Sequence, residues 1–257
     1  MSTTPSSQHA AAPLRASHER LAALVTGLDE DALLAPSYDD DWSIGKVLSH
    51  LGSQAEIFDL MVAAAAAGEP VPGNEVFGPV WERWDAKAPV QWRDDLLRAD
   101  RAHLERVESL DPDVRIPLFG TDYDVAGYVR FRLAEHAVHT WDVAVALDPA
   151  ATVSPDAVAL LLDGLGATAA RAGRGSATPF RVRVGTTDPA RDLVVTVADG
   201  VTIAPAEQDD SYDGSVDLPA EAFLRLVTGR LDPDHTPPFS ESGARGLADL
   251  RAAFPGY

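Results

Sequence analysis

Apolar residues recur at helical spacing along the first two-thirds of the chain. The pattern is clearest where Ile44, Val47 and Leu51 would lie on one helical face, with Ser43 as the N-cap. Residues 68–88 contain several glycines and prolines, which predicts a long crossover loop. Because four long helices with one long connection are typical of an antiparallel bundle, we expect that architecture. The predicted helices span residues 14–28, 44–67, 90–109 and 124–147.

A different pattern begins near residue 176. The segments FRVRV and LVVTV alternate in a way that predicts two strands, and Asp199-Gly200 predicts a hairpin turn before VTIAP. Helical spacing returns in LPAEAFLRLVTGR and GARGLADLRAAF. The predicted fold class is therefore α plus α+β. We expect a helical bundle in residues 14–172, including a fifth helix capped by Ser154, and a small α+β domain in residues 176–257.

Composition and charge narrow the classes of partner. The 257 residues are 46% hydrophobic, enough for a packed core, and their formal net charge is −19. Such an acidic surface repels nucleic acid and anionic membranes, so an anion site would need its own positive charge. The N-terminus lacks a signal-peptide pattern, and its first dozen residues predict a loose tail. The apolar run LMVAAAAAG is too short to span a membrane, so we expect a cytoplasmic protein.

The stretch RLAEHAVHTWDVA, residues 132–144, places acidic and imidazole groups in an otherwise apolar helix. Glu135 and His139 are four residues apart and share one helical face, and Asp142 lies on the same stripe. A carboxylate and an imidazole at this spacing form a two-point clamp for zinc or a similar divalent ion. His50, at the margin of its own helix's apolar stripe, is the third candidate ligand.

Spacing alone leaves other roles open. The i, i+4 pair could be solvated on an exposed face, and His50 could be a half-buried histidine with one hydrogen bond. Asp142 could orient a neighbouring side chain or, like His136, fill a fourth metal position. Tyr128 and Arg132 lie on the same stripe, and either His136 or Tyr128 could act as an acid or base or simply pack.

Two stretches are similar to a known family. DWSIGKVLSHL and EHAVHTWDVAVAL resemble motifs of the mycothiol-dependent maleylpyruvate isomerase family. The resemblance implies a DinB-like four-helix bundle followed by a sterol-carrier-like α+β domain. It also places His50, Glu135 and His139 on the zinc-ligand positions and implies mycothiol as the thiol. The family uses an arginine of the second domain near the zinc. Arg230 in LVTGR is our candidate for this catalytic residue, with Arg225 behind it.

The resemblance implies thiol chemistry on a small electrophilic molecule. The chain has no cysteine, so the sulfur must come from a low-molecular-weight thiol. A thiolate would add to the electrophile. Release of the adduct is S-transfer, whereas bond rotation and elimination give cis–trans isomerisation. Two alternatives stay open: a non-catalytic metal- or ligand-binding module, and a metal-dependent hydrolase that uses zinc-bound water.

Overall fold

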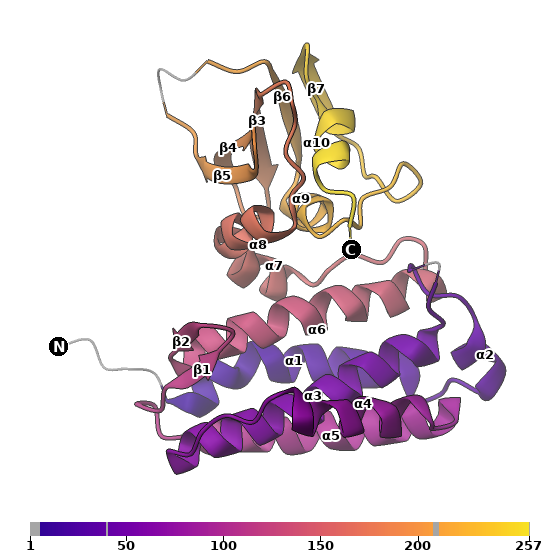
Figure 1. The fold of residues 1–257 in the computed structure, drawn as a ribbon. Coiled ribbons are helices and arrows are strands. Elements are labelled where there is room, and N and C mark those ends of the chain that lie inside the picture. The colour runs from indigo at the N-terminus through magenta and orange to yellow at the C-terminus, as the bar shows by residue number, and fades with distance from the viewer. Residues whose placement is uncertain (1–5, 40, 208–210, 257) are drawn as a thin grey trace. The chain divides into compact units, whose positions relative to one another are not determined.

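The chain divides into two compact units, Met1–Ala151 and Thr152–Tyr257. The structure, a computed structural model, describes residues 6–39, 41–207 and 211–256 (Figure 1). No helix among these residues is long and apolar enough to cross a lipid bilayer. The first unit contains all three candidate metal ligands, and the second contains Arg230.

Four long helices pack together in the first unit: α1 (Ser7–Val25), α3 (Ile44–Ala67), α5 (Pro89–Ser109) and α6 (Val125–Leu147). Both α1 and α3 pack against α5 and α6 (Figure 1). The hydroxyl of Ser43 caps α3 by accepting a hydrogen bond from the Lys46 N–H at 3.1 Å. The carboxylate of Asp124 caps α6 by accepting from the Gly127 N–H at 2.6 Å. The four long helices expected from the sequence are present, and polar side chains cap the starts of α3 and α6.

Residues 68–88 are not a plain loop. They contain α4 (Asn74–Asp85), which packs against α3. Its buried residues, Phe77, Val80 and Trp84, are spaced by three and four, as on one face of a helix. The glycines and prolines around them obscured this short pattern, so the prediction of a crossover loop throughout this range is wrong.

The first helix begins at Ser7 rather than at residue 14. The Ser6 hydroxyl accepts a hydrogen bond from the His9 N–H at 3.3 Å, and Ala11 is fully buried. Residues 6–12 are therefore not a loose tail, and the rest of the predicted tail lies outside the described residues. Three further short elements described in the first unit were not predicted: α2 (Glu30–Leu34) and the antiparallel pair β1 (Ile116–Leu118) and β2 (Thr121–Tyr123).

The second unit is built around a sheet of the strands β3 (Phe180–Thr187), β4 (Arg191–Val197), β5 (Val201–Pro205), β6 (Gly214–Pro219) and β7 (Ser240–Gly243). Their order in the sheet is β5-β4-β3-β6-β7. The β3–β6 pair is parallel, and the other neighbours are antiparallel. The predicted strands and the Asp199-Gly200 turn are present, and burial alternates along β3 as the sequence pattern indicated.

The segment predicted as a fifth helix of the bundle belongs to the second unit. It forms α7 (Pro155–Leu161) and α8 (Leu165–Ala172), joined by a short 3₁₀ turn. Both contact α9 (Ala220–Val227), and α8 also packs on β5. The C-terminal helix is α10 (Leu247–Ala253). The structural division therefore falls at residues 151–152, before the predicted boundary near residue 176.

Gly52 allows α4 to approach α3 closely. A Cβ atom at this position would lie 2.2 Å from the ring of Trp84, well inside van der Waals contact. Trp84 is 1% exposed, and its Nε1–H donates to Glu56 at 2.9 Å, so the ring is held in place. The absence of a side chain at Gly52 is therefore a packing requirement two residues from His50.

We predict that Gly52→Ala lowers the free energy of unfolding by about 1–3 kcal/mol, because overpacking outweighs the helix propensity that alanine adds. Urea denaturation measures this change. Gly27→Ala is the matched control, because nothing lies within 4 Å of the added methyl group. Equal stability of the two variants would contradict the packing account.

Candidate metal centre

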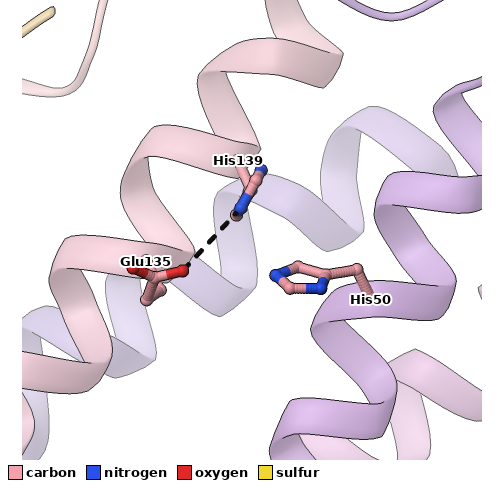
Figure 2. A group of neighbouring side chains, drawn as sticks. All are labelled: His50, Glu135 and His139. Carbon is pink, nitrogen blue, oxygen red and sulfur yellow. Dashed lines mark ion pairs between the residues drawn. The ribbon is translucent and has the colours of Figure 1, made fainter. Parts of the chain in front are cut away.

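Helices α3 and α6 bring the three predicted ligands together. His50 projects from α3 toward Glu135 and His139 on α6 (Figure 2). One ligand atom from each residue lies within 4.8 Å of the other two. The Nε2 of His139 is 3.8 Å from Glu135 Oε2, and the two imidazole rings lie 4.8 Å apart at 68°. The i, i+4 pair faces a third donor, so it is not simply solvated on an open surface.

The surroundings of these groups are partly enclosed. The side chain of His139 is 12% exposed and that of Glu135 is 40% exposed. The ring of Trp42 lies 5.0 Å from the His50 ring and stacks at 6.1 Å on the His139 ring. The candidate centre is therefore covered by the Trp42 ring beside the two histidines and is accessible to solvent at Glu135.

Asp142 orients His139. Its side chain is fully buried, and Oδ2 lies 2.8 Å from Nδ1 of His139. Because a carboxylate only accepts, the proton of the neutral imidazole sits on Nδ1, and the Nε2 lone pair faces Glu135. Metal-ligating histidines are commonly held by a carboxylate in this way. Of the two roles left open by the sequence, the structure gives Asp142 that of an orienting group.

The chemistry and spacing of the three donors fit a zinc ion. Two neutral imidazoles and one carboxylate are a ligand set that catalytic zinc sites use. Donors around tetrahedral zinc lie about 2.0–2.2 Å from the metal, hence about 3.4 Å from one another, so small side-chain rotations would close the group. Among the residues that the structure describes, no fourth imidazole or carboxylate joins it. Such a set leaves a coordination position for a ligand from solution.

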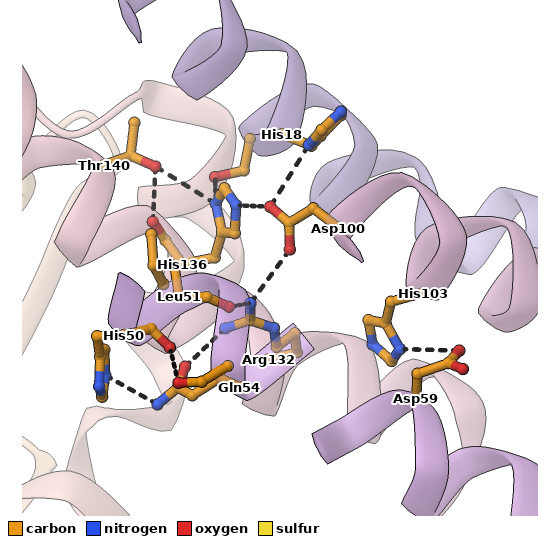
Figure 3. A network of polar contacts seen from close by, with 12 residues as sticks. His18, His50, Leu51, Gln54, Asp59, Asp100, His103, Arg132, His136 and Thr140 are labelled. Atoms are coloured by element: carbon orange, nitrogen blue, oxygen red, sulfur yellow. Dashed lines mark hydrogen bonds and ion pairs between the residues drawn. The ribbon is translucent and has the colours of Figure 1, made fainter. Parts of the chain in front are cut away.

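A buried polar network lies beside the centre (Figure 3). Asp100 on α5 is bonded to Nε2 of His136 at 2.7 Å and to the Arg132 guanidinium at 3.3 Å. Nδ1 of His136 lies 2.8 Å from the Ser17 hydroxyl, so both of its ring nitrogens are engaged. His18 adds a contact to Asp100 at 3.4 Å. His136 and Arg132 are therefore part of the bundle core, and His136 does not fill a fourth metal position.

The charges in this network determine the protonation states of Asp100 and His136. Burial alone would raise the pKa of Asp100, but the contacts of His136 and the charge of Arg132 hold it well below the usual range. Burial lowers the pKa of His136, and Asp100 only partly offsets that effect. The network therefore holds one carboxylate against one guanidinium, with a neutral imidazole donating from Nε2.

Tyr128 is also part of the core. Its hydroxyl lies 2.7 Å from Nε2 of His103, and both side chains are fully buried. Burial raises the pKa of Tyr128 far above its ordinary value. The hydroxyl is thus unsuited to give up a proton near neutral pH, and the packing role is the one the structure favours.

Arg230 and Arg225 lie in the second unit. Arg225 is buried, bonds both oxygens of Glu221 at 2.6 and 3.0 Å, and donates to the carbonyl oxygens of Arg230 and His235. It therefore fixes the segment that follows α9. Arg230 donates from Nη1 to the carbonyl of Thr228 at 2.8 Å. Its catalytic role stays a prediction.

Two residues near the centre were not singled out from the sequence. Gln54 lies one turn after His50, so the i+4 rule applied to α3 would have found it. Trp42 precedes the cap of α3, within the quoted motif. Its position beside both histidines depends on how the chain enters α3, which residue spacing does not predict.

We predict that Asp100→Asn lowers the free energy of unfolding by about 3–5 kcal/mol at pH 7, because it leaves the Arg132 charge buried without a carboxylate. The pKa of Asp100 is depressed in the fold, so its contribution is complete above its unfolded pKa of about 3.9 and is lost as the pH falls further. Urea titrations at several pH values measure the difference in unfolding free energy between the unaltered protein and Asp100→Asn. This difference should become smaller only below about pH 4. Asp122→Asn, at an exposed ion pair, should change stability by less than about 1 kcal/mol. A small difference in unfolding free energy at pH 7 would show that Asp100 does not balance the buried charge of Arg132.

Known proteins resemble this chain in sequence and in fold. A family model described as the mycothiol maleylpyruvate isomerase N-terminal domain matches residues 14–144. No curated protein matches the chain. Two crystal structures of mycothiol-dependent maleylpyruvate isomerase, one of them a histidine-to-alanine mutant, are similar with a TM-score of 0.66. They are 15% and, for the mutant, 14% identical, and each match covers 94% of this chain and 96% of the other.

At this level of identity the crystal structures establish a likeness of fold over nearly the whole chain. The family model covers just over half of the residues, including His50, Glu135 and His139. The resemblance found in the sequence is confirmed: the chain belongs to the family defined by the mycothiol maleylpyruvate isomerase N-terminal domain.

Proposed function

We propose that this chain is a cytoplasmic zinc-dependent enzyme that uses mycothiol to act on a small electrophilic molecule. The observation that supports this most directly is the convergence of His50, Glu135 and His139, with Asp142 behind one imidazole. Membership of the family supports mycothiol as the thiol. We also propose that the two units correspond to a DinB-like bundle and a sterol-carrier-like module.

The composition of the chain fits a thiol supplied from solution. The sequence contains no cysteine, and the three-ligand set leaves a coordination position available. A free thiol with a pKa of about 8.5 is only about 3% ionised at pH 7. When bound, the zinc would supply a Lewis acid that stabilises the deprotonated sulfur.

The protein's own groups would hold this centre in a defined charge state. The two histidines act as neutral ligands and Glu135 as the single anionic one, which leaves one net positive charge with a divalent ion. That charge is a local exception on a chain of net charge −19 and would favour an anionic partner. Asp142 fixes the His139 ring, and Trp42 shields the histidine side from water.

Two reactions share the same first step. The thiolate sulfur adds to one carbon of a conjugated cis double bond. A carbon–sulfur bond forms, the electron pair of the broken π bond moves onto the conjugated group, and a single bond free to rotate remains. Breaking the carbon–sulfur bond after rotation returns the thiol and gives the trans isomer, whereas release of the adduct is S-transfer. The names of the similar structures favour an isomerase of the maleylpyruvate type. Arg230 is proposed to contact an acidic group of the substrate or thiol.

We predict that His50→Ala lowers zinc affinity by at least about 100-fold and abolishes zinc-dependent mycothiol binding, because one of the three direct metal ligands is lost. Zinc content after dialysis against a chelator measures the first effect, and calorimetric titration with mycothiol measures thiol binding. His9→Ala is the control at an exposed histidine. Full zinc content in His50→Ala would show that His50 is not a metal ligand. Turnover without any thiol in the unaltered protein would instead favour a hydrolase.

We predict that Asp142→Asn lowers zinc affinity by about 10- to 100-fold, because the anionic partner of His139 Nδ1 is lost while its shape is kept. A chelator competition assay measures the affinity, and thermal denaturation of the metal-free protein checks the fold. Unchanged zinc affinity in a folded variant would show that Asp142 does not orient a metal ligand.

A further inference from the structure

Gln54 joins the candidate metal centre to the buried network. It lies on α3, and its side-chain nitrogen is 3.0 Å from Nε2 of His50 (Figure 3). Its side-chain oxygen accepts a hydrogen bond from Nη1 of Arg132 at 2.8 Å. The carboxamide is half-buried and is therefore held between an imidazole and a guanidinium.

These contacts fix the direction of both hydrogen bonds. A guanidinium only donates, so the carboxamide oxygen must face Arg132 and the NH₂ group must face His50. An amide nitrogen only donates, so Nε2 of His50 must be the acceptor, with the ring proton on Nδ1. The nitrogen of His50 that points toward Glu135 and His139 in Figure 2 is this Nε2. The hydrogen bond from Gln54 therefore occupies the Nε2 lone pair that a metal ion would need.

The same lone pair cannot serve Gln54 and a metal ion together. Once His50 coordinates through Nε2, the Gln54 N–H loses its acceptor. The carboxamide cannot move far, because Arg132 is fully buried and is itself fixed by the Leu51 carbonyl at 3.1 Å and by Asp100 at 3.3 Å. A tethered donor is thus left beside the metal centre and needs a new acceptor.

We propose that Gln54 is a thiol-binding residue, which donates its side-chain N–H to the anionic sulfur of the low-molecular-weight thiol at the open coordination position. This inference rests on the proposed function and adds a residue that the three-ligand set does not include. Arg132 acts through Gln54 as a positioning residue. Since zinc must displace the Gln54 hydrogen bond from His50, Gln54 does not contribute to zinc affinity.

The proposal predicts different effects of a Gln54 substitution on zinc affinity and on mycothiol affinity. Gln54→Leu removes the donor, so zinc binding stays equal or becomes up to about tenfold tighter, because a neutral hydrogen bond no longer has to be broken. Mycothiol binding to the zinc-loaded protein weakens about ten- to 100-fold, the range for a hydrogen bond to a charged group. A purely structural role for Gln54 would instead weaken zinc and thiol binding in parallel.

Two further variants keep the test decisive. Gln54→Glu retains an acceptor for Arg132, so it protects the fold if the leucine variant leaves that guanidinium unsatisfied, yet it has no N–H to donate. It should also retain zinc and lose thiol affinity. Ser53→Ala is the neighbouring control, because that hydroxyl donates to the His50 carbonyl and not to its ring.

The experiment measures zinc affinity by chelator competition and mycothiol affinity by calorimetry on the zinc-loaded proteins. Thiol affinity reduced at least tenfold in both Gln54 variants, with zinc affinity retained, supports the proposal. Thiol affinity within twofold of the unaltered protein, or a parallel loss of zinc, overturns it while leaving the proposed function standing. Failure of the unaltered protein to bind zinc or mycothiol overturns the proposed function and this inference with it.

Discussion

The buried ion pair between Arg132 and Asp100 is the interaction on which the first unit depends. Arg132 belongs to α6 and Asp100 to α5, while the Leu51 carbonyl of α3 and His18 of α1 complete their contacts. A buried charge pair is costly to desolvate and is tolerated only when its partners are in place. All four long helices therefore have to adopt one register before these contacts can form.

The same helix register also places the three candidate ligands close to one another. Arg132 lies three residues before Glu135, so fixing the guanidinium against α3 also fixes the face of α6 that presents Glu135 and His139. From Arg132 the hydrogen bonds continue through Gln54 to His50. The buried pair and the candidate metal centre are thus parts of one connected polar structure, in which the core fixes the helices that present the candidate ligands.

Much of this arrangement could be predicted from local patterns. Apolar spacing, with the Ser43 cap of one helix, predicted the long helices, and the i, i+4 rule with one further histidine predicted the three residues that lie together. The partners of Asp100 could not be predicted this way, since His136 is 36 residues away and only packing joins them. Likewise, the apolar faces of α7 and α8 were evident in the sequence, but nothing local indicated that α9 and β5 would cover them. The short helix α4 was missed because breaker residues surround its three buried positions.

We expect a zinc ion held by two imidazoles and a carboxylate to accept an external thiol. X-ray absorption at the zinc edge tests this most directly, because the chain has no cysteine to supply a thiolate. We predict nitrogen and oxygen neighbours at about 2.0–2.2 Å in the purified protein, and one added sulfur at about 2.3 Å when mycothiol is present. Zinc that acquires no sulfur neighbour with mycothiol, or protein that holds no zinc, would contradict the account.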